Sequence, residues 1–279
     1  MVKYVRIRVK SALQRSGLPD IDYALNPYAG CFHSCRYCYA PYYTPYREVS
    51  ENWGEVVYIK ENIVELLQKE IRSKKRGVVG VSTITDPYQP VEREEMLTRR
   101  SIKVLLPVGF HVSIQTKSDL VLRDVDVLTE HSSRVDVGLT IITIRDELAK
   151  KVEPYAPPPS RRLKALYELS EQGIETWVFL GPIIPGFNDN PRLIEEVIEV
   201  ASEAGSEVMY DYLHLKSGLE EKLALSGISA TSIMLSRSKA WRKKINNTIS
   251  FLCKKYSVKC KTAFPTKNRT ERNILNYFS

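Results

Sequence analysis

Apolar runs and amphipathic stretches alternate along the chain at a regular spacing. Apolar runs of strand length occur at Ile21–Asn26, Val78–Ile84, Phe110–Thr116, Val135–Thr143, Thr176–Gly181 and Glu207–His214. Between them, apolar residues recur at three- and four-residue steps, the period of a helix, as in segments 63–71, 163–169 and 193–201. Strands that alternate with helices in this way predict parallel βα units, with the helices outside the sheet.

The number of units predicts an α/β fold, a partial (β/α)6 TIM-type barrel, with a doubly wound open sheet as the alternative. In barrels the active site is built by the loops that follow the strands. Polar or glycine-rich segments follow all the predicted strands, at residues 31–38, 85–88, 115–118, 140–143, 181–189 and 210–216. Because these segments would meet on one face, they favour the barrel.

The pattern changes after Lys216. Apolar residues then recur at three-, four- and seven-residue steps and predict one long amphipathic helix, through Met234, Trp241, Ile245, Ile249, Leu252 and Tyr256. Its apolar face is expected to cover the open edge of the incomplete barrel, since exposed sheet edges need cover. The predicted organisation is an N-terminal arm (1–18), a partial barrel (19–216) and a basic C-terminal helical extension that packs on the barrel (217–279).

Composition indicates an ordinary soluble protein. The chain has 279 residues, of which 43% are hydrophobic and 27% charged, and this length is enough for one large domain with an appendage or for two small domains. No apolar run approaches the roughly 18 residues that a membrane helix needs. The N-terminus lacks the continuous apolar core of a signal peptide. We therefore expect a cytoplasmic protein with no membrane partner.

The net charge of +8 is unevenly distributed. Residues 231–279 carry twelve Lys or Arg and one acid, Glu271, a balance of +11, whereas the remaining 230 residues have a balance of −3. A nearly neutral body with a basic C-terminal segment is typical of a protein that binds phosphate, so nucleic acid is a candidate partner through this segment. The alternative is a solvated basic helix without a partner.

The most informative residues are Cys31, Cys35 and Cys38, spaced Cys-x3-Cys-x2-Cys. Three thiolates can bind three corners of a four-iron cluster and leave the fourth iron to an outside ligand. The alternative is a zinc site whose fourth ligand is His33, Cys253 or Cys260. A disulfide framework is disfavoured, because five cysteines is an odd count in a long chain without an export signal. Instead, Cys253 is predicted to lie in the core and Cys260 in a turn or strand.

This spacing, with Tyr37 before the last cysteine, resembles the radical S-adenosylmethionine (SAM) superfamily. Further segments resemble its spore photoproduct lyase-like (DNA repair photolyase-like) family and follow the family's order over roughly residues 20–190. They are Asn26–Cys31, Tyr37–Ala40, Thr85-Asp86-Pro87, Thr116-Lys117-Ser118, Glu153-Pro154 and Arg162-Leu163.

The resemblance implies an enzyme that uses a [4Fe-4S] cluster to cleave SAM to methionine and a 5′-deoxyadenosyl radical. The three cysteines would hold the cluster and Tyr37 would lie against the adenine. Lys117 would face the SAM carboxylate, and Thr85, Asp86 and Thr140 would bind its ribose and amino group.

The resemblance also implies an electron donor such as ferredoxin or flavodoxin, and a substrate that is a nucleic acid or nucleotide. A radical SAM enzyme acting on a peptide or small metabolite, and a non-catalytic zinc-binding nucleic-acid module, are the alternatives.

The chain departs from the photoproduct lyases at one position. Those lyases carry a hydrogen-donor cysteine just before the second-strand Thr/Ser-Asp element, where this chain has Ser82 and Thr83. Phenols give up hydrogen atoms more readily than alcohols do, so Tyr39 is the catalytic residue expected to replace the thiol. Tyr210 is the other phenol near a strand end, and we expect it to pack rather than react.

Overall fold

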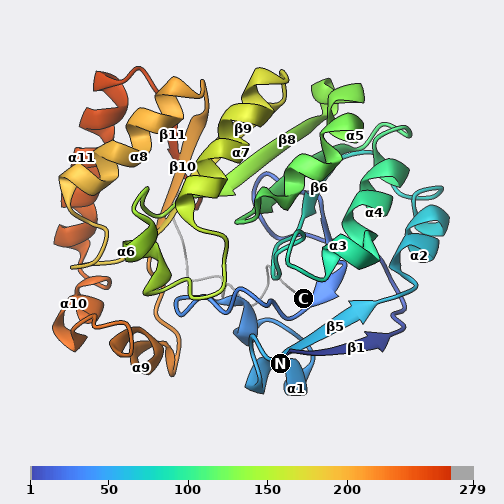
Figure 1. Cartoon of the computed structure of the whole chain (residues 1–279), viewed down its shortest axis with the longest axis horizontal. Coiled ribbons are helices and arrows are strands. Elements are labelled where there is room, and N and C mark those ends of the chain that lie inside the picture. The colour runs from blue at the N-terminus through green and yellow to red at the C-terminus, as the bar shows by residue number, and fades with distance from the viewer. Residues whose placement is uncertain (1, 265–279) are drawn as a thin grey trace.

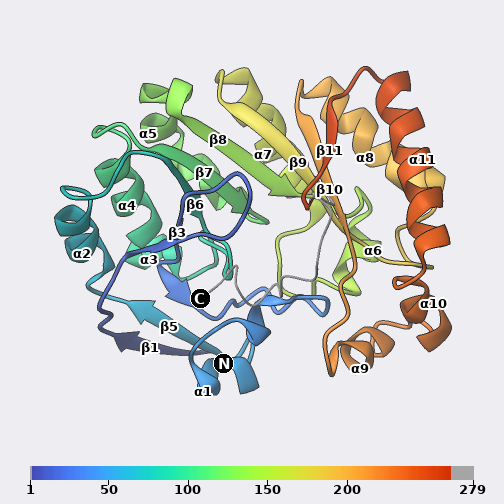
Figure 2. The ribbon, with the colours of Figure 1, turned by 180° about the vertical axis from the view of Figure 1, so that it is seen from behind.

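The computed structural model describes residues 2–264. Its main sheet has the strand order β11-β10-β9-β8-β7-β6-β3-β2, and every adjacent pair is parallel except β2 and β3 (Figure 2). The strands are β2 (Leu13–Arg15), β3 (Tyr23–Leu25), β6 (Val78–Val81), β7 (His111–Thr116), β8 (Val135–Thr140), β9 (Glu175–Ile183), β10 (Glu207–Tyr212) and β11 (Cys260–Thr262). The predicted parallel α/β sheet is confirmed, and each predicted strand contributes to it.

The outer helices form a layer on one side of this sheet: they lie in front of it in Figure 1, and the strands lie in front of them in the reverse view of Figure 2. These helices are α2 (Ile63–Glu70), α4 (Leu97–Leu105), α5 (Val125–Glu130), α7 (Pro159–Glu171), α8 (Pro191–Glu203) and α11 (Lys239–Lys255). A doubly wound sheet would carry helices on both faces. The arrangement is therefore that of a partial barrel, as predicted.

Local sequence explains where the outer helices begin. Pro159 and Pro191 occupy the first turns of α7 and α8, where the missing amide hydrogen costs nothing. The Asn190 side chain caps α8 by accepting the Arg192 N–H at 2.9 Å. The apolar faces of both helices are then buried against the sheet.

Shorter elements connect the barrel units. The short helices are α1 (Arg47–Glu51), α3 (Glu92–Glu95), α6 (Asp146–Lys150), α9 (Leu219–Ala224) and α10 (Ala230–Leu235), and the 3-10 turns are η1 (Ala40–Tyr42), η2 (Asp119–Asp124) and η3 (Ser132–Arg134). None of the helices among residues 2–264 has the length and apolarity to cross a bilayer.

The N-terminal residues join a second, three-stranded sheet of order β1-β5-β4. Its strands are β1 (Lys3–Ile7), β4 (Tyr28–Ala29) and β5 (Val56–Lys60). Because β4 immediately precedes the three cysteines, this sheet fixes the start of the cysteine loop. The proposed boundaries at residues 18 and 216 remain predictions.

The C-terminal region differs from the single predicted helix. Met234 lies in α10, whereas the other residues of the predicted stripe lie in α11 or just after it. The two helices are separate because the Ser238 side chain caps the start of α11 by accepting the Trp241 N–H. The open edge is covered by a strand, since β11 pairs in parallel with β10. Helix α11 packs beside α8 in the outer layer, where Ile245, Ile249 and Leu252 are buried.

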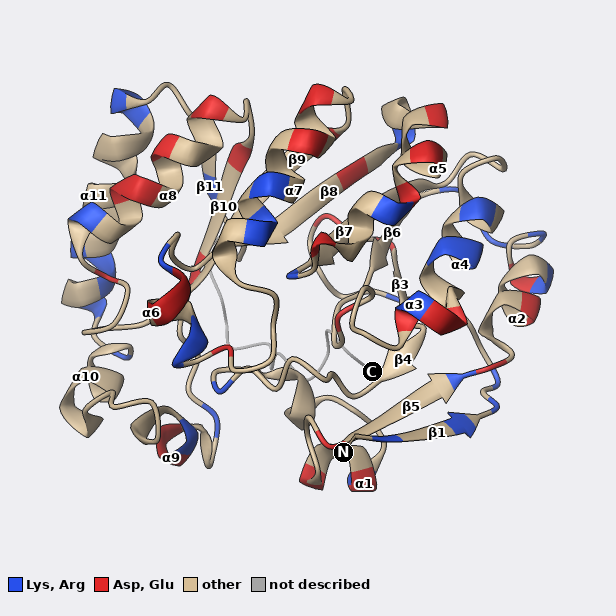
Figure 3. Ribbon diagram, viewed as in Figure 1, with Lys and Arg blue, Asp and Glu red and all other residues tan. Residues whose placement is uncertain are grey.

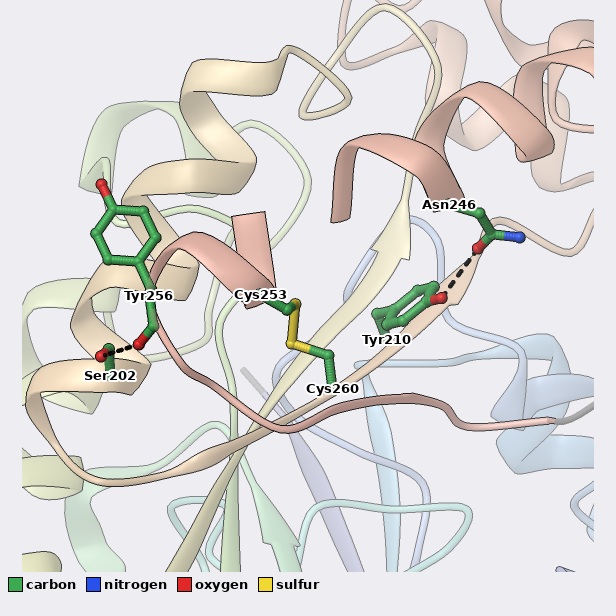
Figure 4. The surroundings of a disulfide bond; sticks show 6 residues. All are labelled: Ser202, Tyr210, Asn246, Cys253, Tyr256 and Cys260. Atoms are coloured by element: carbon green, nitrogen blue, oxygen red, sulfur yellow. Dashed lines mark hydrogen bonds between the residues drawn. A yellow bond between two sulfur atoms is a disulfide. The ribbon is translucent and has the colours of Figure 1, made fainter. Parts of the chain in front are cut away.

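Cys253 and Cys260 form a disulfide in the structure (Figure 4), a pairing that the sequence argument disfavoured. Cys253 is buried, as expected, and Cys260 lies in β11. The Val258 N–H donates to the Cys253 carbonyl at 2.9 Å, so the turn after α11 returns the chain beside the helix end. An odd number of cysteines argues only against a framework in which every cysteine is paired, and it is compatible with this one disulfide.

Candidate metal centre and cofactor site

The cysteine loop (residues 31–38) lies between β4 and η1, and all three of its thiols are free. Cys31 and Cys35 are each 8% exposed, and Cys38 is half-buried. Burial raises the pKa of Cys35 to about 12. A buried thiol of this kind becomes a thiolate near neutral pH when a cation binds it, which is the behaviour of a metal ligand.

Hydrogen bonds from the segment after β6 hold the start of this loop. The Gly30 carbonyl accepts from Thr85 Oγ1 at 2.6 Å and from Gln89 Nε2 at 3.1 Å. Gln89 Oε1 in turn accepts the Phe32 N–H at 2.9 Å. Gly30 has φ +90°, and a Cβ there would lie 2.4 Å from the Val56 carbonyl, so only glycine fits this turn. Thr85, predicted to bind SAM, therefore also supports the loop.

Asp86 links three segments of the site. Its carboxylate accepts from Thr116 Oγ1 at 2.7 Å and from the Lys117 N–H at 2.8 Å, and His33 Nδ1 lies 3.3 Å away. Burial alone would raise the pKa of Asp86, but His33 and these hydrogen bonds outweigh it and hold the pKa well below its usual range. The ionised carboxylate thus fixes the cysteine loop against the end of β7.

A buried chain of polar contacts runs behind Tyr37. The Tyr37 hydroxyl donates to Glu153, and Glu153 forms an ion pair with Arg162 at 2.6 Å. Both charged side chains are 0% exposed. Arg162 NH1 also donates to the Thr140 carbonyl at 3.0 Å, so the chain ends on β8. Burial would raise the pKa of Glu153, but Arg162 and Lys117 outweigh it and lower the pKa.

Lys117 and Thr140 lie at neighbouring strand ends, where the structure brings them together with the loop. Lys117 is half-buried, with Nζ 5.7 Å from the centre of the Tyr37 ring. Burial would lower the pKa of Lys117, but Cys35 and Glu153 outweigh it and raise the pKa, so the side chain is a cation. Gln115 Nε2 donates to Thr140 Oγ1 at 3.3 Å.

All the predicted site residues line one cavity of about 560 Å³ in the partial barrel: Cys31, Cys35, Tyr37, Cys38, Tyr39, Thr85, Asp86, Lys117 and Thr140. The cavity continues along the inner face of the sheet as far as Val78, His111, Glu175 and Glu207, at the starts of their strands. Its volume lies in the range of small-molecule sites. The arrangement can bind a metal cluster at one end and a zwitterionic, ribose-bearing ligand beside it.

The two tyrosines considered as hydrogen donors lie in different places. Tyr39 lines the cavity, and its hydroxyl donates to the Thr83 carbonyl at 2.6 Å. Tyr210 is buried on the helix side, where its hydroxyl donates to Asn246 of α11 at 2.9 Å (Figure 4). The expected packing role of Tyr210 is confirmed by these contacts.

Sequence reasoning assigned no role to Glu153, Arg162 or Gln89, although the first two belong to quoted motif segments, and it considered His33 only as a possible zinc ligand. A charged pair such as Glu153 and Arg162 gives no local signal that it will be buried, since most Glu and Arg side chains are exposed. The one available signal was their place in the quoted motif segments, Glu153-Pro154 and Arg162-Leu163.

Comparisons with known proteins agree with this geometry. The family model described as "Radical SAM superfamily" matches residues 25–201. An uncharacterised protein of Methanocaldococcus jannaschii is 33% identical over 255 residues, 91% of this chain and 95% of that protein. Spore photoproduct lyase complexed with dinucleoside spore photoproduct has TM-score 0.67 and 13% identity, covering 94% of this chain and 82% of its own.

A second solved structure is more distant. Streptococcus suis SuiB bound to the precursor peptide SuiA has TM-score 0.56 and 13% identity, covering 88% of this chain and 49% of its own. At these identities both solved structures show the fold alone, whereas the family model spans most of the barrel. The chain belongs to the radical SAM superfamily, and its fold resembles that of spore photoproduct lyase.

Proposed function

We propose that this protein is an enzyme in which Cys31, Cys35 and Cys38 hold a [4Fe-4S] cluster that, with SAM bound, supplies reductive cleavage of SAM to methionine and a hydrogen-abstracting 5′-deoxyadenosyl radical. The observation that carries the proposal is the set of three free thiols on one buried loop, facing a cavity that also contains the Lys117 cation. Three protein ligands leave one iron open for a ligand from outside the protein.

The residues present fit a cluster better than a zinc ion. A structural zinc site needs a fourth protein ligand. Of the candidates, Cys253 and Cys260 are bonded to each other, and His33 faces Asp86. Within residues 2–264, no three His, Cys, Asp or Glu side chains converge closely enough to hold one metal ion. Three thiolates with no fourth protein ligand suit a four-iron cluster whose remaining iron takes an outside ligand.

The roles proposed for the chain's own residues are supported by their place in one cavity. Lys117 would neutralise the SAM carboxylate, Tyr37 would lie against the adenine, and Thr85, Asp86 and Thr140 would bind the ribose and amino group. Lys117→Ala should weaken SAM affinity by roughly 1.5–3 kcal/mol, the contribution of a charged hydrogen bond. The measurement is a SAM titration followed by the cluster's absorption spectrum. Unchanged affinity would remove Lys117 from the site.

Nucleic acid is the substrate class that we infer. It is supported by the similar fold of spore photoproduct lyase, whose structure holds a dinucleoside, and by the exposed lysines of α11. The peptide alternative is supported by SuiB, whose structure holds a precursor peptide, although this chain covers only 49% of SuiB.

Tyr39 is the proposed hydrogen-atom donor. Its hydroxyl reaches the backbone of Thr83, close to where the photoproduct lyases carry their cysteine. With a phenol in place of the thiol, we expect slow or absent repair of spore photoproduct while SAM cleavage persists. Efficient repair of a photoproduct-containing oligonucleotide would contradict this expectation, and Tyr39→Phe would then test whether the phenol takes part.

Anaerobic reconstitution with iron and sulfide tests the proposal as a whole. We expect about four irons per chain and production of 5′-deoxyadenosine on reduction with SAM. Tight zinc binding without SAM cleavage would instead support the non-catalytic module. The electron donor, which we propose to be ferredoxin or flavodoxin, can be replaced by dithionite in this assay.

A further inference from the structure

The inner face of the sheet is unusual for a barrel. The strand register places the inward side chains in three rows. The row nearest the strand starts contains Gly80, Ser113, Asp136 and Glu175, and the middle row contains Gln115, Gly138, Trp177 and Glu207. The row nearest the cysteine loop contains Thr140, Phe179, Met209 and Lys261. Closed barrels fill such rows with bulky branched side chains. Apart from Met209, the residues of these rows are polar, aromatic or glycine, and all but Gly138 line the cavity, so the lumen is open.

Two aromatic rings form one wall of this lumen. Trp177 lies over Gly138, where a Cβ would be 2.3 Å from the indole ring. Its Nε1 donates to Asp136 at 2.6 Å, which fixes the plane of the ring. Phe179, one row nearer the cysteine loop, meets Trp177 edge to face with ring centroids 6.5 Å apart. A fixed aromatic wall of this kind binds flat, unsaturated rings by stacking.

Asp136 is the polar anchor of the lumen, and its side chain is 16% exposed. Oδ1 accepts from Ser113 Oγ at 2.7 Å and from Trp177, and Oδ2 lies 2.7 Å from His111 Nε2. A carboxylate offers about four lone-pair positions, so one position on Oδ2 remains for a ligand. Because three donors already bind the Asp136 carboxylate, its vacant position suits a neutral N–H group better than a cation.

The lumen offers acceptors rather than donors. Gln115 Nε2 is used by Thr140, and Gln115 Oε1 has no hydrogen-bond partner among the described residues. Glu175 and Glu207 add carboxylates at the strand starts, where His111 and Lys261 also line the cavity and Lys259 forms an ion pair with Glu207. The vacant acceptor positions of Asp136 and Gln115 bind amino groups rather than phosphate oxygens. The phosphate backbone of a nucleic acid would therefore stay outside the lumen while a base enters it.

We propose that the lumen binds a nucleobase that carries an exocyclic amino group, as in cytosine or adenine, with its ring against Trp177 and Phe179 and its amino group donating to Asp136 or Gln115. Thymine presents a carbonyl where cytosine has its amino group, so an acceptor-lined lumen disfavours it. This inference rests on the proposed nucleic-acid substrate and adds which base the site selects.

The test uses the reconstituted, SAM-loaded full chain and three fluorescein-labelled single-stranded octamers, dC8, dA8 and dT8, in anisotropy titrations. All three carry the same phosphates, so differences among them report the bases. We expect dC8 and dA8 to bind about tenfold more tightly than dT8, within the discrimination that a base-edge contact gives. Asp136→Asn should reduce this preference to within about twofold and leave the dT8 affinity unchanged.

Two further variants guard against local collapse of the lumen in Asp136→Asn. Gln115→Leu removes the other acceptor without touching the Asp136 contacts and should also reduce the preference. Gly138→Ala should displace the Trp177 ring and weaken binding of all three octamers. The matched control is Asp126→Asn on the outer helix α5, where an exposed carboxylate loses its ion pair with Arg99, and this variant should keep the wild-type preference.

The outcomes separate this inference from the function on which it rests. Equal affinities for dC8, dA8 and dT8 would overturn base selection and leave the nucleic-acid substrate standing. Binding of none of the octamers, with a lysine-containing tripeptide amide bound instead, would overturn both and favour the peptide alternative. A preference for dT8 would also overturn the inference, because an acceptor-lined lumen cannot produce it.

Discussion

The molecule carries two groups of cysteines, and their surroundings differ. In the cysteine loop the thiols are free and are held by buried polar contacts from Thr85, Gln89 and Asp86. In the C-terminal unit, α11 and β11, Cys253 lies among apolar side chains and is bonded to Cys260. The environment thus decides the chemistry of a cysteine: polar contacts at the strand ends keep thiols available for metal, whereas a helix end beside a strand brings two of them together.

The two regions also differ in how they carry charge. Near the loop the charges are buried and paired, as in Glu153 and Arg162. On α11 they are at the surface, where Figure 3 shows Lys and Arg segments along the helix beside the acidic segments of α8. Buried pairs fix geometry, whereas exposed charges act on partners in solution.

The largest expected effect comes from the thiols of the loop. Substituting Cys31, Cys35 or Cys38 by Ala should abolish cluster assembly and SAM cleavage, because a cluster bound by three thiolates cannot lose one of them. Iron content and 5′-deoxyadenosine production measure this.

The cysteines of the C-terminal unit are the matched control for that experiment. Cys253→Ala and Cys260→Ala should retain the iron content of the wild type. Loss of iron in either variant would mean that the ligand assignment is wrong and that the two groups of cysteines are not separate.

The next effect concerns the buried ion pair behind Tyr37. Glu153→Ala leaves the Arg162 guanidinium buried without its partner and should lower the free energy of unfolding by about 3–5 kcal/mol. Urea denaturation measures the loss. Glu196→Ala, which removes the partner of the half-exposed Arg145, is the surface control and should cost no more than about 1 kcal/mol. Equal losses would contradict the distinction between buried and exposed charge.

How far the sequence predicts these features depends on how local their causes are. The strand β8, Val135–Thr140, has apolar residues at alternate positions and lies within the predicted strand Val135–Thr143, so its place was predictable. The break at Ser238 was not, because the apolar stripe continues across it and only the capping hydrogen bond marks the new helix. The pair of Glu153 and Arg162 was likewise hidden, since burial of a charge is set by tertiary packing.

The third effect is on the stability of the C-terminal unit. Cys253→Ala removes a disulfide across a sequence separation of 7 residues and should lower the free energy of unfolding of the oxidised protein by roughly 2–3 kcal/mol. Adding a reductant to the wild type should produce a similar shift in urea denaturation. No shift in either case would show that the apolar stripe of α11 alone holds the unit together.

The smallest effect concerns the exposed cations. Lys239, Lys243 and Lys244 are exposed on α11, and if they contact phosphates, neutralising all three should reduce the slope of log K against log salt by up to about two to three units. The control is the double variant of Lys255 and Lys259, which are held by Glu195 and Glu207 and should leave the slope nearly unchanged. Anisotropy of a labelled oligonucleotide across a salt series gives both slopes. Equal reductions would mean that total charge matters rather than this face of α11. An unchanged slope in both variants would mean that other residues make the phosphate contacts. The candidates would then include the basic residues Lys267, Arg269 and Arg272, which lie outside the described residues.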